Sequence, residues 1–296
     1  MHVTLIHNPG AGDDDHSGEE LCRLLREAGH EVRYQSVKET DWRAALEHRS
    51  DLVVAAGGDG TVRKVFKEPA LRHPAVTLLP LGSANNIART LGFADEDERR
   101  LVEGWSRARR RPFDVGLVSA PWGEARFVES FGGGIFADVL ARAEDDPDGE
   151  EKLELGLRVL RDVLEDASPA RWSLDVDGSE LSGEWLGVEV MNVRETGPNV
   201  PLAPDADPSD GLFDVVCIRP DDRSALVAYV EGRIDGRRPP APRLPARRGA
   251  AIKLRPPGGG RLHVDDELWP ADPHAHAADA VVEVSRRSVE LLVPSR

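Results

Sequence analysis

The sequence predicts two domains: an α/β N-terminal domain with a parallel sheet over residues 1–118, and a mainly β, sandwich-like C-terminal domain over residues 119–296. Apolar strand patterns alternate with helical patterns in the first part, whereas short alternating runs separated by Pro, Gly and Asp turns fill the second. The final segment is placed in the second domain, with a return to the first domain as the alternative. At 296 residues and 40% hydrophobic residues, the chain can bury a core in each domain.

Local signals define the elements of the first domain. Ser17 and Glu20 form an S-x-x-E capping box before a helix that Gly29 ends, and Thr40 can cap a second helix. The runs 52–56 and 75–80 are continuously apolar, which is typical of buried parallel strands. We expect strands and helices, in order, at residues 3–7, 18–28, 31–37, 41–49, 52–56, 75–80, 87–91 and 95–107.

Short strands dominate the second domain, and one helix interrupts them. Residues 150–165 carry apolar side chains at helical spacing and are expected to pack on the sandwich, with a cover over a substrate groove as the alternative. Cys22 and Cys217 lie in apolar patterns typical of core residues rather than of a disulfide. The expected strands lie at residues 125–131, 172–176, 186–193, 212–218, 251–254, 261–264 and 281–293.

Two glycine-rich loops follow neighbouring strands of the first domain. The first loop, residues 57–61, reads Gly-Gly-Asp-Gly-Thr, and the second loop, residues 82–86, reads Gly-Ser-Ala-Asn-Asn. Glycine lets the backbone approach an anion closely, and the carboxyl edge of a parallel sheet is where such loops bind phosphate. Asp59 would repel a phosphate unless a divalent cation or a proton donor lies between them, which favours metal-assisted phosphoryl chemistry. An ordinary turn after a buried strand is the alternative.

These two loops resemble motifs of the diacylglycerol kinase catalytic superfamily, which includes sphingosine kinases and bacterial lipid kinases. Residues 3–12, 127–137 and 206–215 are similar to its first strand with an Asn-Pro loop, its glycine segment and its Asp-Gly-x-Phe/Leu-Asp motif. The resemblance implies ATP and Mg²⁺ as cofactors and a lipid or lipid-like alcohol as substrate, at a cleft between the two domains. The nucleotide-binding residues that it implies are Asn8, Gly57, Gly58, Asp59, Gly60, Thr61, Gly82, Ser83 and Asn85.

An acidic segment near the C-terminus supplies the remaining catalytic candidates. Residues 262–269 resemble the catalytic Asp-Gly-Glu segment of these kinases, with Asp266 in place of the glycine. Phosphoryl transfer to an alcohol needs an acceptor for the hydroxyl proton. We expect Glu267 to be this acceptor and Asp265 to orient it or link it to metal, with Asp59 as the third catalytic residue. A solvated turn is the alternative.

Three further acids are assigned to metal binding by the same resemblance. Asp210 and Asp214 belong to the Asp-Gly-x-Phe/Leu-Asp motif, and Asp114 resembles an acid near the interdomain cleft. An Asx-type turn before the strand 212–218 is the alternative reading of the first two.

Two positions depart from the family pattern and leave other functions open. Asn86 replaces the usual acid of the second loop, and Lys64 stands where a Glu commonly follows the first. Lys64 can lie near phosphates or on an exposed helix face. The predicted function is an ATP- and Mg²⁺-dependent kinase acting on a hydroxyl of a diacylglycerol-type lipid. The alternatives are an NAD kinase and a nucleotide-binding regulatory protein without turnover.

Charge and hydropathy limit the partners. A formal net charge of −15 argues against nucleic acid, which requires a basic face. The sequence contains neither a membrane-spanning run nor an N-terminal signal pattern, so a cytoplasmic protein is expected. The basic runs 107–111 and 233–248 are read as solvated surface or as transient contacts to anionic lipid at the inner membrane face. A homodimer is compatible with this reading.

Overall fold

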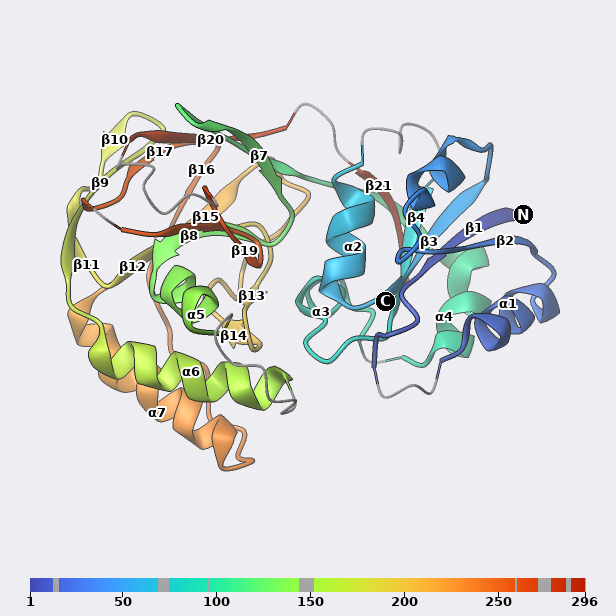
Figure 1. Ribbon diagram of the computed structural model, residues 1–296, viewed down its shortest axis with the longest axis horizontal. Coiled ribbons are helices and arrows are strands. Elements are labelled where there is room, and N and C mark those ends of the chain that lie inside the picture. Colours follow the sequence, from blue (N-terminus) through green and yellow to red (C-terminus); the bar gives the residue numbers. More distant parts are fainter. Residues whose placement is uncertain are drawn as a thin grey trace. The chain divides into compact units, whose positions relative to one another are not determined.

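The computed structural model describes residues 1–12, 16–68, 75–94, 96–143, 152–258, 260–270, 278–285 and 289–295. The chain forms two compact units, each visible in Figure 1. Unit 1 comprises Met1–Val115 with Arg287–Arg296, and unit 2 comprises Gly116–Arg286. The expected domain boundary at residue 118 falls inside β6 (Gly116–Ala120), which is the first strand of unit 2.

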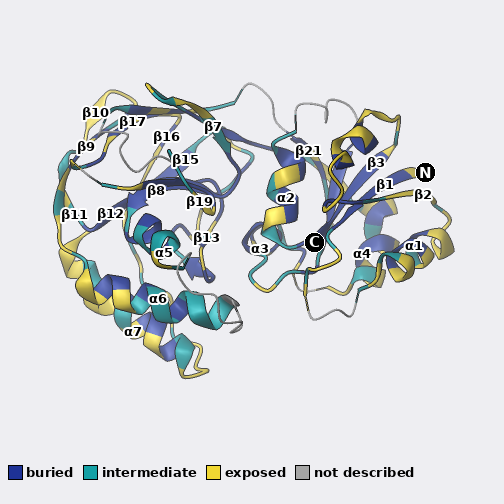
Figure 2. Ribbon diagram, viewed as in Figure 1, coloured by how far each residue is buried: buried dark blue, intermediate teal, exposed yellow. Residues whose placement is uncertain are grey.

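Unit 1 is built on one sheet. Within the described residues its strands run in the order β2-β1-β3-β4-β21-β5, parallel from β2 to β21 and antiparallel between β21 and β5. All six residues of β3 are buried, as expected for a central parallel strand covered on both faces (Figure 2). The predicted parallel α/β fold is confirmed. The strands are β1 His2–His7, β2 Glu31–Ser36, β3 Leu52–Gly57, β4 Ala75–Pro80, β5 Arg109–Phe113 and β21 Val289–Val293.

The helices of unit 1 begin and end near the predicted residues, with one correction. The capping box is confirmed, because the Ser17 hydroxyl accepts from the Glu20 N–H at 3.2 Å and the Glu20 carboxylate accepts from the Ser17 N–H at 3.1 Å. The expected α-helix at 41–49 is instead the 3₁₀ helix Trp42–Glu47, which buries Trp42 and Ala45 at a spacing of three. Position 95, the predicted start of the last helix, lies outside the described residues. The helices are α1 Gly18–Glu27, α2 Asp59–Phe66, α3 Asn86–Leu91, α4 Glu98–Gly104 and the 3₁₀ helix Trp105–Arg107.

Unit 2 is a sandwich of two antiparallel sheets, which confirms the predicted second fold. In the described part of the chain one sheet has the order β10-β9-β17-β20-β6-β7 with β11 on β9, and the other has the order β16-β15-β12-β8-β18-β19. Side chains from both sheets, such as Trp172 and Phe213, form the core between them. The strands are β7 Gly123–Phe127, β8 Ser130–Gly134, β9 Ala170–Val176, β10 Ser179–Glu180, β11 Gly183–Trp185, β12 Gly187–Met191, β15 Phe213–Ile218, β16 Ala246–Gly249, β17 Ala251–Arg255, β18 Leu262–Val264, β19 Glu267–Leu268 and β20 Ala280–Val284, with a separate pair β13 Glu195–Thr196 and β14 Val200–Pro201.

The prediction of one strand at 281–293 is wrong, because two strands, β20 and β21, lie in this part of the chain. β20 pairs with β6 and β17 in unit 2, whereas β21 pairs with β4 and β5 in unit 1. Residues 286–288, between the two strands, lie outside the described residues. The two halves of this run have similar apolar patterns because both are strands, although their partners belong to different sheets.

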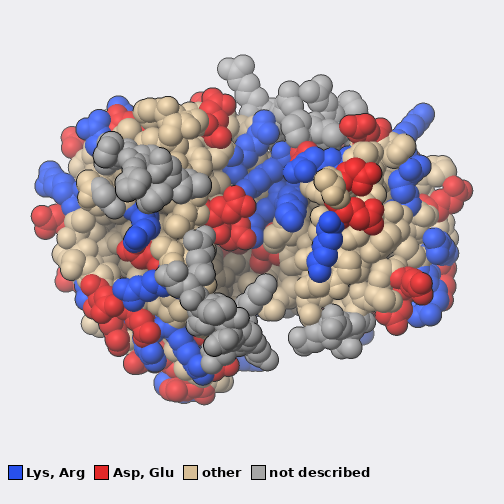
Figure 3. Space-filling model, viewed as in Figure 1, with Lys and Arg blue, Asp and Glu red and all other residues tan. Residues whose placement is uncertain are grey.

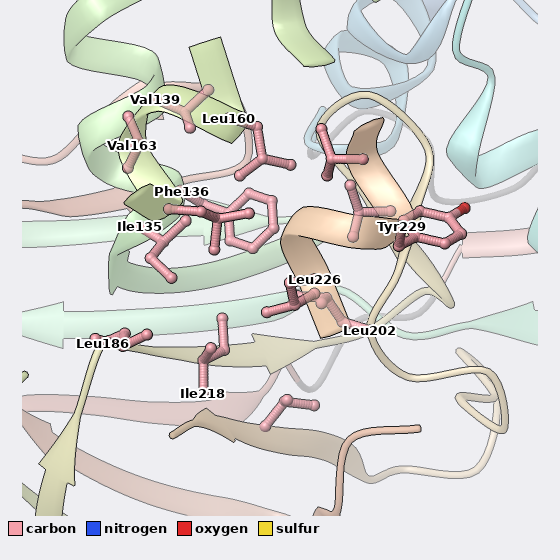
Figure 4. Packing of buried hydrophobic residues seen from close by; sticks show 14 of the residues in the cluster. Ile135, Phe136, Val139, Leu160, Val163, Leu186, Leu202, Ile218, Leu226 and Tyr229 are labelled. Carbon is pink, nitrogen blue, oxygen red and sulfur yellow. The ribbon is translucent and has the colours of Figure 1, made fainter. Parts of the chain in front are cut away.

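Three helices form a second hydrophobic core on the outer face of the β12 and β15 sheet (Figure 4). They are α5 Ile135–Ala143, α6 Lys152–Asp166 and α7 Arg223–Ile234, with a 3₁₀ turn at Pro220–Asp222. Leu157, Leu160 and Leu164 of α6 are buried in this core, so the helix predicted at 150–165 packs on the sandwich. Among the described helices, none is both long enough and apolar enough to span a membrane.

Candidate functional site

The two glycine-rich loops of unit 1 touch each other through their glycines. β3 and β4 are adjacent parallel strands with Gly57 opposite Pro80, so the loops leave the same edge of the sheet. A Cβ atom built on Gly82 would lie 2.4 Å from the Gly58 Cα, and one built on Gly58 would lie 3.1 Å from the Gly82 Cα. A side chain at Gly82 would force the loops apart, and one at Gly58 would require a small shift of the Gly82 backbone. The structure therefore brings the two predicted loops into contact at Gly58 and Gly82.

Asp59 links the first loop to the helix that follows the second. It is the first residue of α2, and its carboxylate accepts hydrogen bonds from the N–H groups of Asn86 at 2.9 Å and Ile87 at 3.0 Å. These N–H groups belong to the first turn of α3, whose donors have no partner within the helix. A carboxylate is favourable there because of the partial positive charge of a helix start. Asp59 thus organises the loops, in addition to its predicted catalytic role.

Asn85 stabilises the second loop from within. Its backbone is left-handed, with φ 53°, and its side-chain oxygen accepts from the Gly82 N–H at 3.1 Å while its amide donates to the Gly82 carbonyl. Asn8 plays a similar local part after β1, because its side-chain oxygen accepts from the Gly10 N–H at 3.2 Å. Ser83 is exposed.

The remaining loop residues differ in exposure. Thr61 is buried against Gly57, where a Cβ would lie 2.3 Å from its hydroxyl oxygen. Lys64 is exposed on α2, where Lys and Arg side chains gather over the helix in Figure 3. This placement favours the exposed-helix reading of Lys64. Asn86 is buried, and its N–H group is committed to Asp59.

The acids assigned to metal binding lie in two different settings. Asp114 is buried in unit 1. Asp210 of unit 2 accepts from the Leu212 N–H at 3.0 Å, as in an Asx turn, and it shares Arg248 with Asp214. Burial raises the pKa of Asp214, and Arg248 partly offsets that rise. Within the described residues, no three His, Cys, Asp or Glu side chains form a group that could hold a metal ion.

The acidic turn of unit 2, residues 265–267, joins β18 to β19. Asp265 is buried and left-handed, with φ 53°, and its carboxylate accepts from the N–H groups of Val128 at 3.0 Å, Glu129 at 2.7 Å and Ser130 at 3.3 Å. Glu267, in contrast, is exposed. Asp265 thus holds the turn against the segment that leads into β8.

The structure also contains a buried acid–base pair that the sequence analysis missed. Glu189 of β12 and His263 of β18 are 0% and 1% exposed, and His263 Nε2 lies 3.0 Å from a Glu189 carboxylate oxygen. His263 Nδ1 lies 2.8 Å from the carbonyl oxygen of Asp265. The sequence signal that could have indicated this pair is Glu189 itself, a charged residue within the apolar run 186–191. Its partner His263 is 74 residues away in the chain, so no local pattern connects the two.

Several arginines of the two basic runs bond to other groups of the protein. The pairs are Arg110 with Glu290, Arg237 with Asp235 at 2.8 Å, and Arg248 with Asp210. These contacts show that part of each basic run is paired within the protein.

Comparison with known proteins is consistent with this arrangement. Residues 2–118 match the model of the diacylglycerol kinase catalytic domain, and residues 130–292 match that of the YegS C-terminal NAD kinase beta sandwich-like domain. A diacylglycerol kinase of Bacillus subtilis (strain 168) is 27% identical over 234 residues, covering 73% of each chain. A probable lipid kinase YegS-like protein of Pseudomonas aeruginosa (strain UCBPP-PA14) is 30% identical over 224 residues, covering 72% of this chain and 70% of that protein.

The fold is also shared with solved structures. A diacylglycerol kinase structure from Bacillus anthracis str. Sterne superposes with a TM-score of 0.68 at 16% identity, covering 99% of this chain and 96% of that chain. The family models match successive parts of the chain that correspond to the parallel α/β unit and the antiparallel sandwich. The chain therefore belongs to the diacylglycerol kinase catalytic family of lipid kinases.

Proposed function

We propose that the protein transfers the γ-phosphoryl group of ATP to a hydroxyl of a lipid or lipid-like alcohol of the diacylglycerol type. The observation that carries this proposal is the junction of the two loops of unit 1, where Gly58 meets Gly82 and Asp59 binds the start of α3. Two glycine loops that pack this closely at the carboxyl edge of a parallel sheet are the kind of backbone arrangement that binds phosphate. Catalysis would then depend on positioning and on neutralisation of the phosphate charge.

Mg²⁺ is the cation proposed for this reaction, where it would neutralise phosphate charge. In phosphoryl-transfer enzymes it is held by one or two carboxylates together with substrate phosphates and waters. The absence of a three-ligand group among the described residues fits a cation that arrives on the nucleotide. Asp59 and Asp114 of unit 1 are the carboxylates proposed to assist it. Asp210 and Asp214 are proposed to have mainly a structural role, since both carboxylates form ion pairs with Arg248.

We assign the proton acceptor to Glu267 and the orienting role to Asp265. Glu267 is exposed to solvent, as a group that meets a substrate hydroxyl must be, whereas three N–H groups hold the Asp265 carboxylate. Glu267→Gln is expected to lower turnover roughly 10²-fold, the usual scale for loss of a general base, and to leave ATP affinity unchanged. If Asp265→Asn abolishes turnover while Glu267→Gln does not, the two roles are reversed.

The decisive experiment is transfer of labelled γ-phosphate from ATP into a total lipid extract, with identification of the labelled product. NAD is offered as acceptor in parallel. Label in a lipid supports the proposal, and label in NAD alone selects the NAD kinase alternative. ATP binding without transfer to either acceptor selects the regulatory protein.

A further inference from the structure

A row of three residues crosses neighbouring strands of unit 2. Glu189 on β12 and His263 on β18 both lie in register with Gly132 on β8, which runs between them. Phe131 and Val264, the adjacent residues on these strands, point into the core between the sheets, so the row faces the opposite side. A Cβ on Gly132 would lie 2.5 Å from a Glu189 carboxylate oxygen. Glycine at this position therefore allows the acid and the base to meet across the middle strand.

The hydrogen bonds of His263 define where its protons lie. A carbonyl oxygen can only accept, so Nδ1 carries a proton and donates to Asp265. Nε2 and Glu189 then share one further proton. Burial raises the pKa of Glu189, and the pKa of His263 is also raised, because Glu189 and the Asp265 carbonyl outweigh the opposing effect of burial. Both shifts favour retention of the shared proton.

His263 contacts the backbone of Asp265, the residue that carries the strain of the acidic turn. A left-handed backbone costs a non-glycine residue roughly 1–2 kcal/mol, and the φ of Asp265 is 53°. Three groups of Asp265 form hydrogen bonds that offset this cost: its N–H donates to Ser130 O at 2.8 Å, its carboxylate accepts from the N–H groups of residues 128–130, and its carbonyl accepts from His263. The last of these fixes the peptide group between Asp265 and Asp266, one residue before Glu267.

Stability alone does not explain an acid and a base in this row. Replacement of a buried ion pair by apolar side chains of similar volume is often neutral or stabilising. Burial of an acid and a base is therefore weak evidence for a role in stability alone. An apolar pair could not donate a hydrogen bond to the Asp265 carbonyl.

We propose that His263 and Glu189 are positioning residues for the acidic turn: His263 fixes the turn through the Asp265 carbonyl, and Glu189 fixes the orientation and tautomer of the imidazole. This inference rests on the proposed function, because it concerns the aim of the Glu267 carboxylate at a substrate hydroxyl. It assigns neither residue a contact with substrate.

Two substitutions at one position separate the two hydrogen bonds. The amide nitrogen of Asn occupies the place of Nδ1, so His263→Asn keeps the donor to Asp265 and loses the contact with Glu189. The amide nitrogen of Gln occupies the place of Nε2, so His263→Gln keeps a donor to Glu189 and loses the bond to Asp265. We expect His263→Gln to lower kcat about 10²-fold, the scale for a misplaced reacting group, with the KM for ATP unchanged. His263→Asn should retain more turnover than His263→Gln but have the lower unfolding midpoint, since Glu189 loses its buried partner.

Amide hydrogen exchange reports the same difference without catalysis. The N–H groups of residues 128–130 that donate to Asp265 should exchange faster in His263→Gln than in wild type or His263→Asn. Val215→Ala removes buried side-chain atoms from β15 and is the control for general destabilisation. It should not selectively speed the exchange of the N–H groups of residues 128–130.

The outcomes distinguish the inference from the proposed function. If turnover follows the unfolding midpoint, so that His263→Asn loses more activity than His263→Gln, the pair is purely structural and the inference is overturned. Equal exchange of residues 128–130 in both variants overturns it as well. If the wild type transfers no phosphate to lipid, the proposed function fails, and the exchange comparison still decides whether His263 holds the turn.

Discussion

Substitution of Asp59 by Asn tests how far one carboxylate organises the loops of unit 1. The two oxygens of Asp59 accept separately from the N–H groups of Asn86 and Ile87. In Asp59→Asn one oxygen becomes an NH₂ group, which cannot accept from an N–H donor and would face one directly. The variant is almost the same size, so its effect comes from hydrogen bonding and charge rather than from packing.

The expected cost follows from these two contacts. Loss of a hydrogen bond to a charged group costs about 1.5–3 kcal/mol, and loss of a negative charge at a helix start adds about 0.3–1 kcal/mol. We therefore expect Asp59→Asn to lower the free energy of unfolding by about 2–4 kcal/mol, against a typical total of 5–15 kcal/mol. The protein should remain folded. Its second loop should be misplaced, so that ATP affinity falls together with turnover.

Urea unfolding and ATP titration of the same samples provide the measurement. Asp97→Ala is the matched control, because Asp97 caps α4 of the same unit by accepting from the Arg100 N–H at 2.8 Å. Loss of an ordinary cap costs about 1 kcal/mol and should leave ATP affinity unchanged. The reasoning is refuted if Asp59→Asn is no less stable than Asp97→Ala and binds ATP like the wild type.

Two further predictions use the same unfolding assay. Gly82→Ala should lower the free energy of unfolding by about 1–3 kcal/mol, because its Cβ would lie 2.4 Å from the Gly58 Cα. Gly60→Ala in α2 should raise that free energy by about 0.4–1 kcal/mol, since the atom nearest to its Cβ would lie 3.5 Å away. Equal effects of the two substitutions would contradict the contact between the loops. Because the pKa values of Glu189 and His263 are both raised, the native pair keeps a proton that unfolded histidine releases near pH 6.5. Stability should therefore fall as pH rises above about 6.5, by at most about 1.4 kcal/mol per pH unit, and an equal slope from pH 6 to 9 in the double variant Glu189→Gln with His263→Gln, which has neither titrating group, would contradict the shared proton.

The parts of the fold that were predictable from sequence are those that local patterns determine. β3 is a continuous apolar run, and the structure buries all six of its residues because a central parallel strand is covered on both faces. The capping box of α1 was equally local, since its two partners are three residues apart. Around Trp42 the signal was weaker, and tertiary packing replaced the expected α-helix with a 3₁₀ helix.

The pairings between distant segments were not predictable in the same way. The run at 281–293 has one apolar alternation, and nothing local in it says that β20 and β21 join different sheets. The Glu189–His263 contact depends on two strand registers through Gly132, each set by residues far away in the chain. Family resemblance predicted catalytic roles for Asp59 and Asp265, but the sequence did not show that both carboxylates bind backbone N–H groups.

Those backbone contacts bear on which acid performs the chemistry. Asp59 connects the first loop to α3, and Asp265 connects the acidic turn to the segment before β8, so each carboxylate holds together pieces of chain that are distant in sequence. Groups with such partners are well suited to orient a site, because their own positions are fixed. A proton acceptor must instead reach a substrate hydroxyl and change its protonation state during the reaction. Of the two catalytic candidates in the acidic turn, Glu267 has the exposure that this role needs, and the order in which we assign the roles follows from that difference.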